Sequence, residues 1–154
     1  MTQFSEEQVN KYARFMPIAW SFASMSRDPS TKVGALLLGG RYEVLASGWN
    51  GAPRGCNADK DERYSDRNQK LWWATHAEAN AVANAAMAGT STHGAVLVVT
   101  HPPCITCAKL AVQAGVAMVI CNGPDAGFAL RWASDLELTK RLFKEVGVKY
   151  MWIP

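Results

Sequence analysis

The chain has 154 residues, of which 49% are hydrophobic and 19% are charged, and its formal net charge is +3. This length and apolar content suit one compact domain, residues 1–154, with a core of its own. The small positive charge does not favour a nucleic-acid-binding protein, although it is compatible with a small anionic substrate.

The N-terminal residues lack the basic and apolar segments of a secretory signal. No uncharged apolar run reaches the ~18 residues that a membrane span needs. We therefore expect a cytoplasmic protein with neither a membrane nor a nucleic-acid partner. Its four cysteines, without a secretory signal, favour metal binding or catalysis over a disulfide framework.

The first predicted element is an amphipathic helix over residues 5–26. Ser5 can cap this helix, and acidic residues follow in the first turn, where they suit the helix dipole. Pro17 lies inside the apolar repeat and is expected to kink or split the helix. Two strands follow, over residues 33–38 and 42–49, and the tight turn between them predicts an antiparallel hairpin.

The loops around this hairpin carry polar residues with two interpretations each. Arg27 and Lys32 flank a polar turn and are either solvated loop charges or a pair that holds a phosphate. Asn50 follows the second strand, where its amide either shapes a turn or contacts a sugar hydroxyl or a base edge. Residues 57–70 mix charges of both signs, which is typical of an exposed loop, with a lid as the alternative.

An alanine-rich stretch over residues 77–88 predicts a helix that ends at Gly89. Thr75 is the expected N-cap of this helix. His76 and Glu78 then fall in its first turn, where both side chains can point toward whatever faces the helix end.

A buried strand over residues 96–99 precedes a proline-opened helix that runs from Cys104 to about residue 114. Cys104 and Cys107 are three residues apart and therefore share one face of that helix. Two helix N-termini aimed at one metal would favour thiolate ligands. Of the remaining residues of these types, Cys56 and Cys121 are expected to be small apolar fillers rather than ligands.

The last elements are a buried strand over residues 116–120, a helix over 128–146 and an alternating strand over 148–152. Helices that alternate with strands predict an α/β fold whose five-stranded mixed sheet is mostly parallel after the initial hairpin.

The residues His76-Ala-Glu78 and Pro103-Cys-Ile-Thr-Cys107 together form the H-x-E…P-C-x-x-C signature of zinc-dependent nucleobase deaminases. An imidazole and two thiolates supply three zinc ligands and leave a fourth position for water, whose pKa the metal lowers to roughly 7. Glu78 is not a ligand and is predicted to move protons during attack on C4 of a cytosine. A structural zinc site or a redox motif has no use for that acid.

Four stretches of the chain resemble the deoxycytidylate (dCMP) deaminases of the cytidine deaminase-like superfamily. They are Ser26-Arg-Asp-Pro-Ser-Thr-Lys-Val-Gly-Ala35, Gly48-Trp-Asn-Gly-Ala-Pro-Arg-Gly-Cys56, His76-Ala-Glu-Ala-Asn-Ala81 and Pro103-Cys-Ile-Thr-Cys-Ala-Lys-Leu110. The resemblance implies a three-layer α/β/α sandwich and zinc-dependent hydrolysis of dCMP to dUMP and ammonia, which supplies dTMP synthesis. It also implies one catalytic Zn²⁺ on His76, Cys104 and Cys107.

The same resemblance implies that Arg27, Lys32 and Asn50 contact the nucleotide. Members of the family are often homohexamers that dCTP activates and dTTP inhibits. Asn50, Gly51 and Arg54 match the loop near the family's effector site. The resemblance thus implies a homo-oligomer. It leaves open whether dCTP and dTTP regulate the protein and whether dCTP, accompanied by Mg²⁺, is a further substrate.

One segment departs from the family pattern. The family commonly has a tyrosine after the strand that ends here at Ile120, whereas this chain has Cys121-Asn-Gly-Pro124. The base contact on that side is therefore open, and Phe128 is a candidate for it.

Two alternatives share the zinc motif. A tRNA adenosine deaminase-like enzyme should also show a basic surface for RNA, which a net charge of +3 does not favour. A non-catalytic zinc protein would not need the intact Glu78.

Overall fold

The computed structural model describes residues 4–56 and 62–154. Its sheet has five strands in the order β2-β1-β3-β4-β5, with β1 antiparallel to β2 and β3, and with β3, β4 and β5 parallel. The strands are β1 Gly34–Leu38, β2 Val44–Trp49, β3 Val96–Val99, β4 Met118–Asn122 and β5 Lys149–Ile153. The predicted five-stranded mixed sheet is therefore confirmed.

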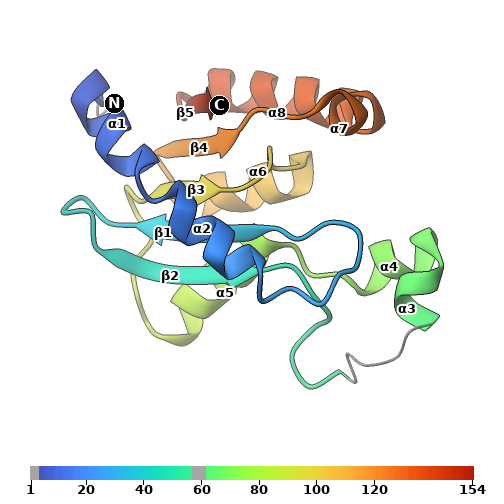
Figure 1. Ribbon diagram of the computed structural model, residues 1–154. Helices are drawn as coiled ribbons and strands as arrows, with labels where there is room; N and C mark the ends of the chain where they lie inside the picture. Colours follow the sequence, from blue (N-terminus) through green and yellow to red (C-terminus); the bar gives the residue numbers. More distant parts are fainter. Residues whose placement is uncertain (1–3, 57–61) are drawn as a thin grey trace.

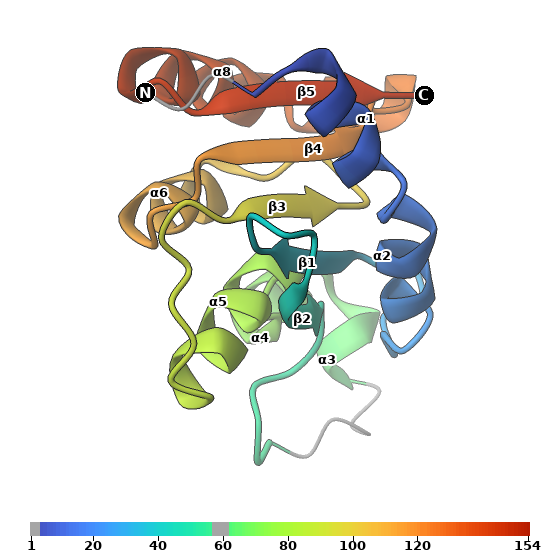
Figure 2. The same ribbon diagram turned by 90° about the vertical axis from the view of Figure 1, so that its left-hand side faces the viewer.

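Helices cover both faces of this sheet (Figure 1). The view along the other axis separates the layers, with α1 and α2 on one face and α5, α6 and α8 on the other (Figure 2). The helices of these two layers are α1 Glu6–Ala13, α2 Met16–Ala23, α5 Ala77–Met87, α6 Ile105–Gln113 and α8 Ala133–Val146. The three-layer α/β/α sandwich is also confirmed. None of the helices in the described part of the chain is long and apolar enough to cross a membrane.

Alternation along the strands produces two separate cores. In β1, Leu36 and Leu38 are buried with residues of α1 and α2. Their neighbours Ala35 and Leu37 are buried with residues of α5, α6 and α8. Because successive side chains of a strand point to opposite faces, an apolar strand such as β1 can serve both layers at once.

Two glycines let helices approach the hairpin closely. A Cβ atom at Gly48 would overlap the carbonyl oxygen of Ala77 in α5, and one at Gly34 would overlap that of Ala19 in α2. Gly48 therefore brings the first turn of α5 directly against β2. That turn carries His76 and Glu78, so a residue without a side chain sets the position of both.

The helix boundaries confirm one expectation and correct two others. The N-terminal helix divides into α1 and α2, with Pro17 in the first turn of α2, as the proline predicted. The helix expected over 128–146 is in fact α7 (Ala126–Arg131) followed by α8, and it breaks at Trp132, whose φ of −115° is not helical. Thr75 is not the cap of α5, because its N–H and C=O both pair with Gly51 and leave His76 as the N-cap.

The charged segment expected to be a loop contains two short helices, α3 (Glu62–Ser65) and α4 (Arg67–Trp73). Asp66 caps α4 by accepting a hydrogen bond from the backbone N–H of Asn68. Residues 57–61 of the expected loop lie outside the described residues. The helices α3, α4 and α7 all lie near the end of the sheet to which β3 and β4 point (Figure 1).

Candidate active site

A cavity of about 430 Å³ opens at this end of the sheet. Its wall combines the loop over residues 26–33, helices α4 and α7, and the N-terminal ends of α5 and α6. The loop that follows β3, Asn50 after β2 and the first turn of α8 also line it. In open α/β sheets, ligands bind outside the carboxyl ends of the parallel strands, and β3 and β4 end here. The volume suits a small organic ligand.

The floor of the cavity holds a cluster of three metal-ligating atoms. One atom each from His76, Cys104 and Cys107 lies within 4.8 Å of the others. His76 Nδ1 is 3.5 Å from Cys104 Sγ and 3.4 Å from Cys107 Sγ. Tetrahedral zinc with bonds of roughly 2.3 Å to sulfur and 2.0–2.1 Å to nitrogen requires a sulfur–nitrogen separation of about 3.5 Å. The three side chains therefore fit a single zinc ion.

Two helix N-termini create this cluster. His76 is the N-cap of α5, and Cys104 is the N-cap of α6, where its sulfur accepts a 3.5 Å hydrogen bond from the N–H of Cys107. Helix α8 fixes the start of α6, since Asp135 accepts a 3.0 Å hydrogen bond from the N–H of Ile105. The positive ends of both helix dipoles thus face the same point and favour thiolate ligands there.

The electrostatics of the cluster separate the two cysteines. Hydrogen bonds from Cys107 and His76 lower the pKa of the Cys104 thiol. The hydrogen bond with Cys104, together with burial, raises the pKa of Cys107. The hydrogen bond to Cys104 raises the pKa of His76 to about 9. Without metal, the cluster holds protons on Cys107 and His76 that a bound cation must displace.

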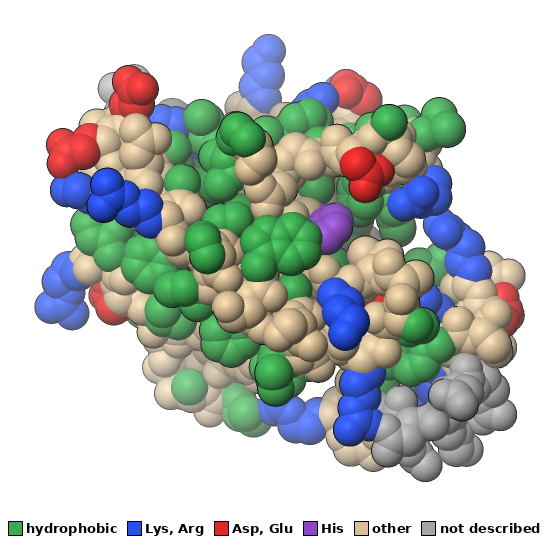
Figure 3. Space-filling view, in the orientation of Figure 1, with side chains coloured by type: hydrophobic (Ala, Val, Ile, Leu, Met, Phe, Trp, Pro, Cys, Tyr) green, Lys and Arg blue, Asp and Glu red, His purple; other side chains and the backbone are tan. Residues whose placement is uncertain are grey.

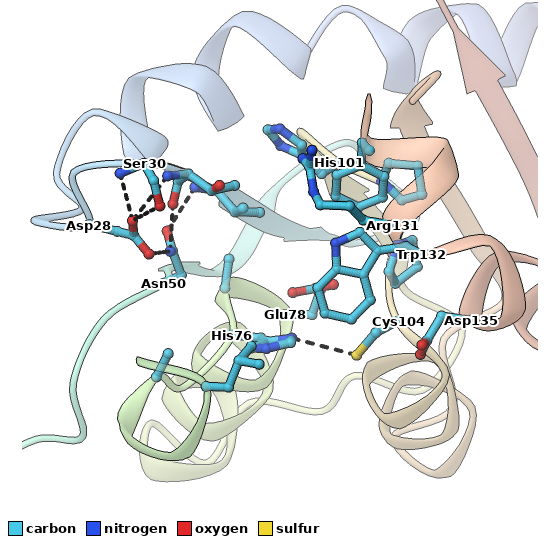
Figure 4. Close-up of a pocket in the computed structure, with 18 of the residues that line it drawn as sticks. Asp28, Ser30, Asn50, His76, Glu78, His101, Cys104, Arg131, Trp132 and Asp135 are labelled. Carbon is cyan, nitrogen blue, oxygen red and sulfur yellow. Dashed lines mark hydrogen bonds between the residues drawn. The ribbon is translucent and has the colours of Figure 1, made fainter. Parts of the chain in front are cut away.

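Glu78 lies beside the cluster, in the first turn of α5, and its side chain lines the cavity (Figure 4). The residue is only 5% exposed. Burial raises the pKa of the Glu78 carboxyl above its usual range, because desolvation penalises the charged form. A carboxyl group with a raised pKa is suited to both accepting and returning a proton near neutral pH.

Asn50 braces one wall of the cavity. Its Oδ1 accepts a hydrogen bond from the N–H of Val33 at 2.7 Å, and its Nδ2 donates to the carbonyl oxygen of Thr31 at 2.8 Å. Nδ2 also lies 3.4 Å from Asp28 Oδ2, which accepts from it (Figure 4). The amide predicted to contact a nucleotide thus lines the cavity while it holds the loop over residues 26–33 in shape.

The buried carboxylate of Asp28 forms an ion pair with the partly exposed Lys70 in the same wall. The Lys70 ammonium lies 2.8 Å from Asp28 Oδ2, and Asp28 itself is 1% exposed. Burial alone would raise the pKa of Asp28. Hydrogen bonds from Lys70, Thr31 and Ser30 outweigh that effect, so the pKa of this carboxyl is lowered. Helix α4 is thereby fastened to the loop over residues 26–33.

The other predicted contacts lie elsewhere. Arg27 and Lys32 are exposed and are not among the residues that line the cavity. Gly51 pairs with Thr75, which fixes the backbone just before His76. Arg54 donates a 2.7 Å hydrogen bond to Asn84 Oδ1 on α5, outside the cavity lining.

Sequence reasoning missed most of the opposite wall. The aromatic rings of His101, Phe128 and Trp132 line the cavity there. Ring centroids are 5.7 Å apart between His101 and Phe128 and 6.0 Å apart between Phe128 and Trp132. Figure 3 shows a histidine at the edge of a hollow on this face of the molecule. Phe128, the candidate replacement for the family's tyrosine, is thus part of the cavity wall, and the aromatic residues after β4 were the available signal.

The comparison with known families agrees with this geometry. Residues 9–122 match the family described as the cytidine and deoxycytidylate deaminase zinc-binding region. The chain belongs to this family. The matched region includes the whole metal cluster and Glu78, and the family resemblance seen in the sequence is therefore confirmed.

Individual relatives cover the chain to different extents. An uncharacterized deaminase encoded in the luxG 3′ region of Aliivibrio fischeri is 34% identical over 149 residues, which are 95% of this chain and 96% of that protein. Human deoxycytidylate deaminase is 34% identical over 110 residues, which are 69% of this chain and 61% of the human protein. The dCMP deaminase of cyanophage S-TIM5, solved with dCMP and dUMP, is 27% identical, with a TM-score of 0.73 over 98% of this chain and 100% of the phage protein.

Proposed function

We propose that this protein is a zinc-dependent deaminase that hydrolyses dCMP to dUMP and ammonia. The observation that carries this proposal is the cluster of His76, Cys104 and Cys107, whose sulfur–nitrogen distances fit one zinc ion, with Glu78 buried beside it. The likeness to relatives named deoxycytidylate deaminase, and to a phage enzyme bound to dCMP and dUMP, supports dCMP as the substrate.

The residues of the cavity floor divide the chemical work. His76, Cys104 and Cys107 would hold zinc, which supplies a Lewis acid that lowers the pKa of bound water to roughly 7. Glu78 accepts one proton from the attacking water and delivers it to the ring nitrogen N3, then transfers the remaining hydroxyl proton to the leaving amino group. Water adds at C4 and the bond between C4 and the amine breaks, which gives dUMP and ammonia. Burial of Glu78 keeps these transfers away from bulk water.

The direct test is ammonia release by the zinc-loaded protein on dCMP, CMP, cytidine and dCTP. We expect turnover of dCMP, and we expect Glu78→Gln to reduce kcat by about 10³-fold while zinc content stays the same. Glu137→Gln, at an exposed position on α8, is the matched control for loss of a carboxylate. A protein that binds one zinc but deaminates none of these compounds would overturn the proposal.

The finer family properties stay predictions. They comprise activation by dCTP, inhibition by dTTP, acceptance of dCTP with Mg²⁺, and a hexamer. Adding dCTP or dTTP to the dCMP assay tests activation and inhibition, and ammonia release from dCTP with Mg²⁺ tests its acceptance as a substrate. Light scattering on the purified protein tests the hexamer. Activity on a tRNA anticodon stem-loop in place of dCMP would instead support the adenosine deaminase alternative.

A further inference from the structure

Among the residues that the structure describes, three lysine and arginine side chains line the cavity, and they differ in what already neutralises them. They are Arg67 and Lys70 on α4 and Arg131 on α7. The Lys70 ammonium contacts both carboxylate oxygens of Asp28, at 2.8 and 2.9 Å. Because Asp28 is almost fully buried, moving Lys70 onto a ligand would leave an unpaired buried charge, which is costly. Lys70 is therefore committed to the fold.

The two arginines are not committed in this way. Within residues 4–56 and 62–154, no ion pair or hydrogen bond joins either the Arg67 or the Arg131 guanidinium to another group. The remaining acids of the cavity lining are already engaged, since Asp135 accepts from the N–H of Ile105 and Glu78 lies beside the metal cluster. Among the described lysine and arginine residues of the lining, Arg67 and Arg131 thus carry a positive charge that no acid neutralises.

These arginines reach the cavity from different elements. Arg67 is the first residue of α4, one turn before Lys70, so the ion pair of Lys70 with Asp28 also places Arg67. Arg131 is the last residue of α7, where the chain turns at Trp132. Figure 4 shows Arg131 across the cavity from Asp28 and Ser30, the residues that hold Lys70. A ligand in the cavity therefore meets one guanidinium from each wall.

The lining of the cavity offers groups that suit each part of a nucleotide. The metal cluster and Glu78 form its floor, the aromatic rings suit a base, and two exposed guanidinium groups remain for an anion. A guanidinium presents a planar fork of donors that matches phosphate oxygens. We propose that Arg67 and Arg131 bind the 5′-phosphate of the substrate and set the preference of this enzyme for a nucleotide over a nucleoside. This inference rests on the proposed deaminase function.

The test compares kcat/KM for dCMP and for deoxycytidine in the zinc-loaded protein. Arg67→Gln and Arg131→Gln should each lower the value for dCMP by about 10- to 100-fold, the range for a hydrogen bond to a charged group, and change the value for deoxycytidine less than about 3-fold. Arg131→Lys should restore part of the loss. Arg141→Gln, at an exposed position on α8 outside the cavity, is the control. Equal losses on both substrates would overturn the proposal.

The predicted pair Arg27 and Lys32 provides a competing assignment. If Arg27→Gln and Lys32→Gln remove the preference for dCMP while the cavity arginine variants keep it, the phosphate lies on the loop over residues 26–33 and the proposal is wrong.

Calorimetric titration with dUMP and deoxyuridine separates this inference from the proposed function. Binding of dUMP that weakens in both arginine variants, in a protein that does not deaminate dCMP, would support the phosphate pair and overturn the proposed reaction. Deamination of dCMP, with dUMP affinity unchanged in both variants, would support the proposed reaction and overturn the phosphate pair. A wild-type protein that neither binds dUMP nor deaminates dCMP would overturn both.

Discussion

The floor and the walls of the cavity are built in different ways. The floor comes from two short motifs at the starts of α5 and α6. The three-residue spacing places Cys104 and Cys107 together, and the packing of the two helix ends adds His76. The walls come from the loop over residues 26–33, from α4 and from α7, which meet only in the folded chain. The comparison shows that two short motifs already carry the metal ligands, whereas the walls draw on separate segments whose meeting no motif indicates.

The largest effect is expected from a substitution that removes a metal ligand from the floor and leaves the walls unchanged. Cys107→Ser removes a soft ligand from a three-ligand site, so zinc content should fall well below one per chain and activity should reach background. Elemental analysis and ammonia release measure the two effects. Cys121→Ser, which changes a buried cysteine outside the cluster, is the control and should keep its zinc. A fully active Cys107→Ser protein would contradict the assigned ligand set.

The next largest effect is expected from a substitution that removes an ion pair from a wall and leaves the metal ligands unchanged. Lys70→Met leaves the Asp28 carboxylate buried without its cation, which should lower the free energy of unfolding by about 3 kcal/mol in a urea titration. The KM for dCMP should also rise, because α4 is no longer held against the loop over residues 26–33. Zinc content should not change.

The double variant Asp28→Asn with Lys70→Met identifies the source of that loss. It should be more stable than Lys70→Met alone, since no unpaired charge remains. If the free-energy changes of the two single variants simply add, the ion pair does not fasten the wall.

The smallest expected effect is the pH dependence of the stability that Asp28, a residue of the wall, contributes. The pKa of Asp28 is lowered in the folded protein relative to the unfolded value of about 3.9. Its contribution to stability is therefore complete above about pH 4 and is lost as the pH falls through the folded pKa. The stability difference between wild type and Asp28→Asn, measured by urea titration, should be constant from pH 5 to 7 and should shrink below pH 4. A difference that grows in acid would contradict the shift.

Much of the fold could be predicted because its signals are local. Short apolar runs bounded by turns or prolines, with alternation only in the last of them, predicted the five strands, and the alanine-rich stretch predicted α5. The break between α7 and α8 at Trp132 could not be predicted, because the apolar spacing in the sequence continues through this residue. In the folded chain, Trp132 lines the cavity. Thr75 failed as a cap for a similar reason, since its backbone is paired with Gly51, a residue 24 positions earlier.

The sequence by itself identified the candidate metal ligands of the floor, because a zinc site needs particular atoms at particular spacings and two short motifs carry them. Only the tertiary structure decided the walls. It placed Arg67 and Arg131 in the cavity and left Arg27 and Lys32 outside its lining. The physical reason is that a charged side chain looks the same in the sequence whether it is solvated, paired or free to bind a ligand, and packing alone distinguishes the three.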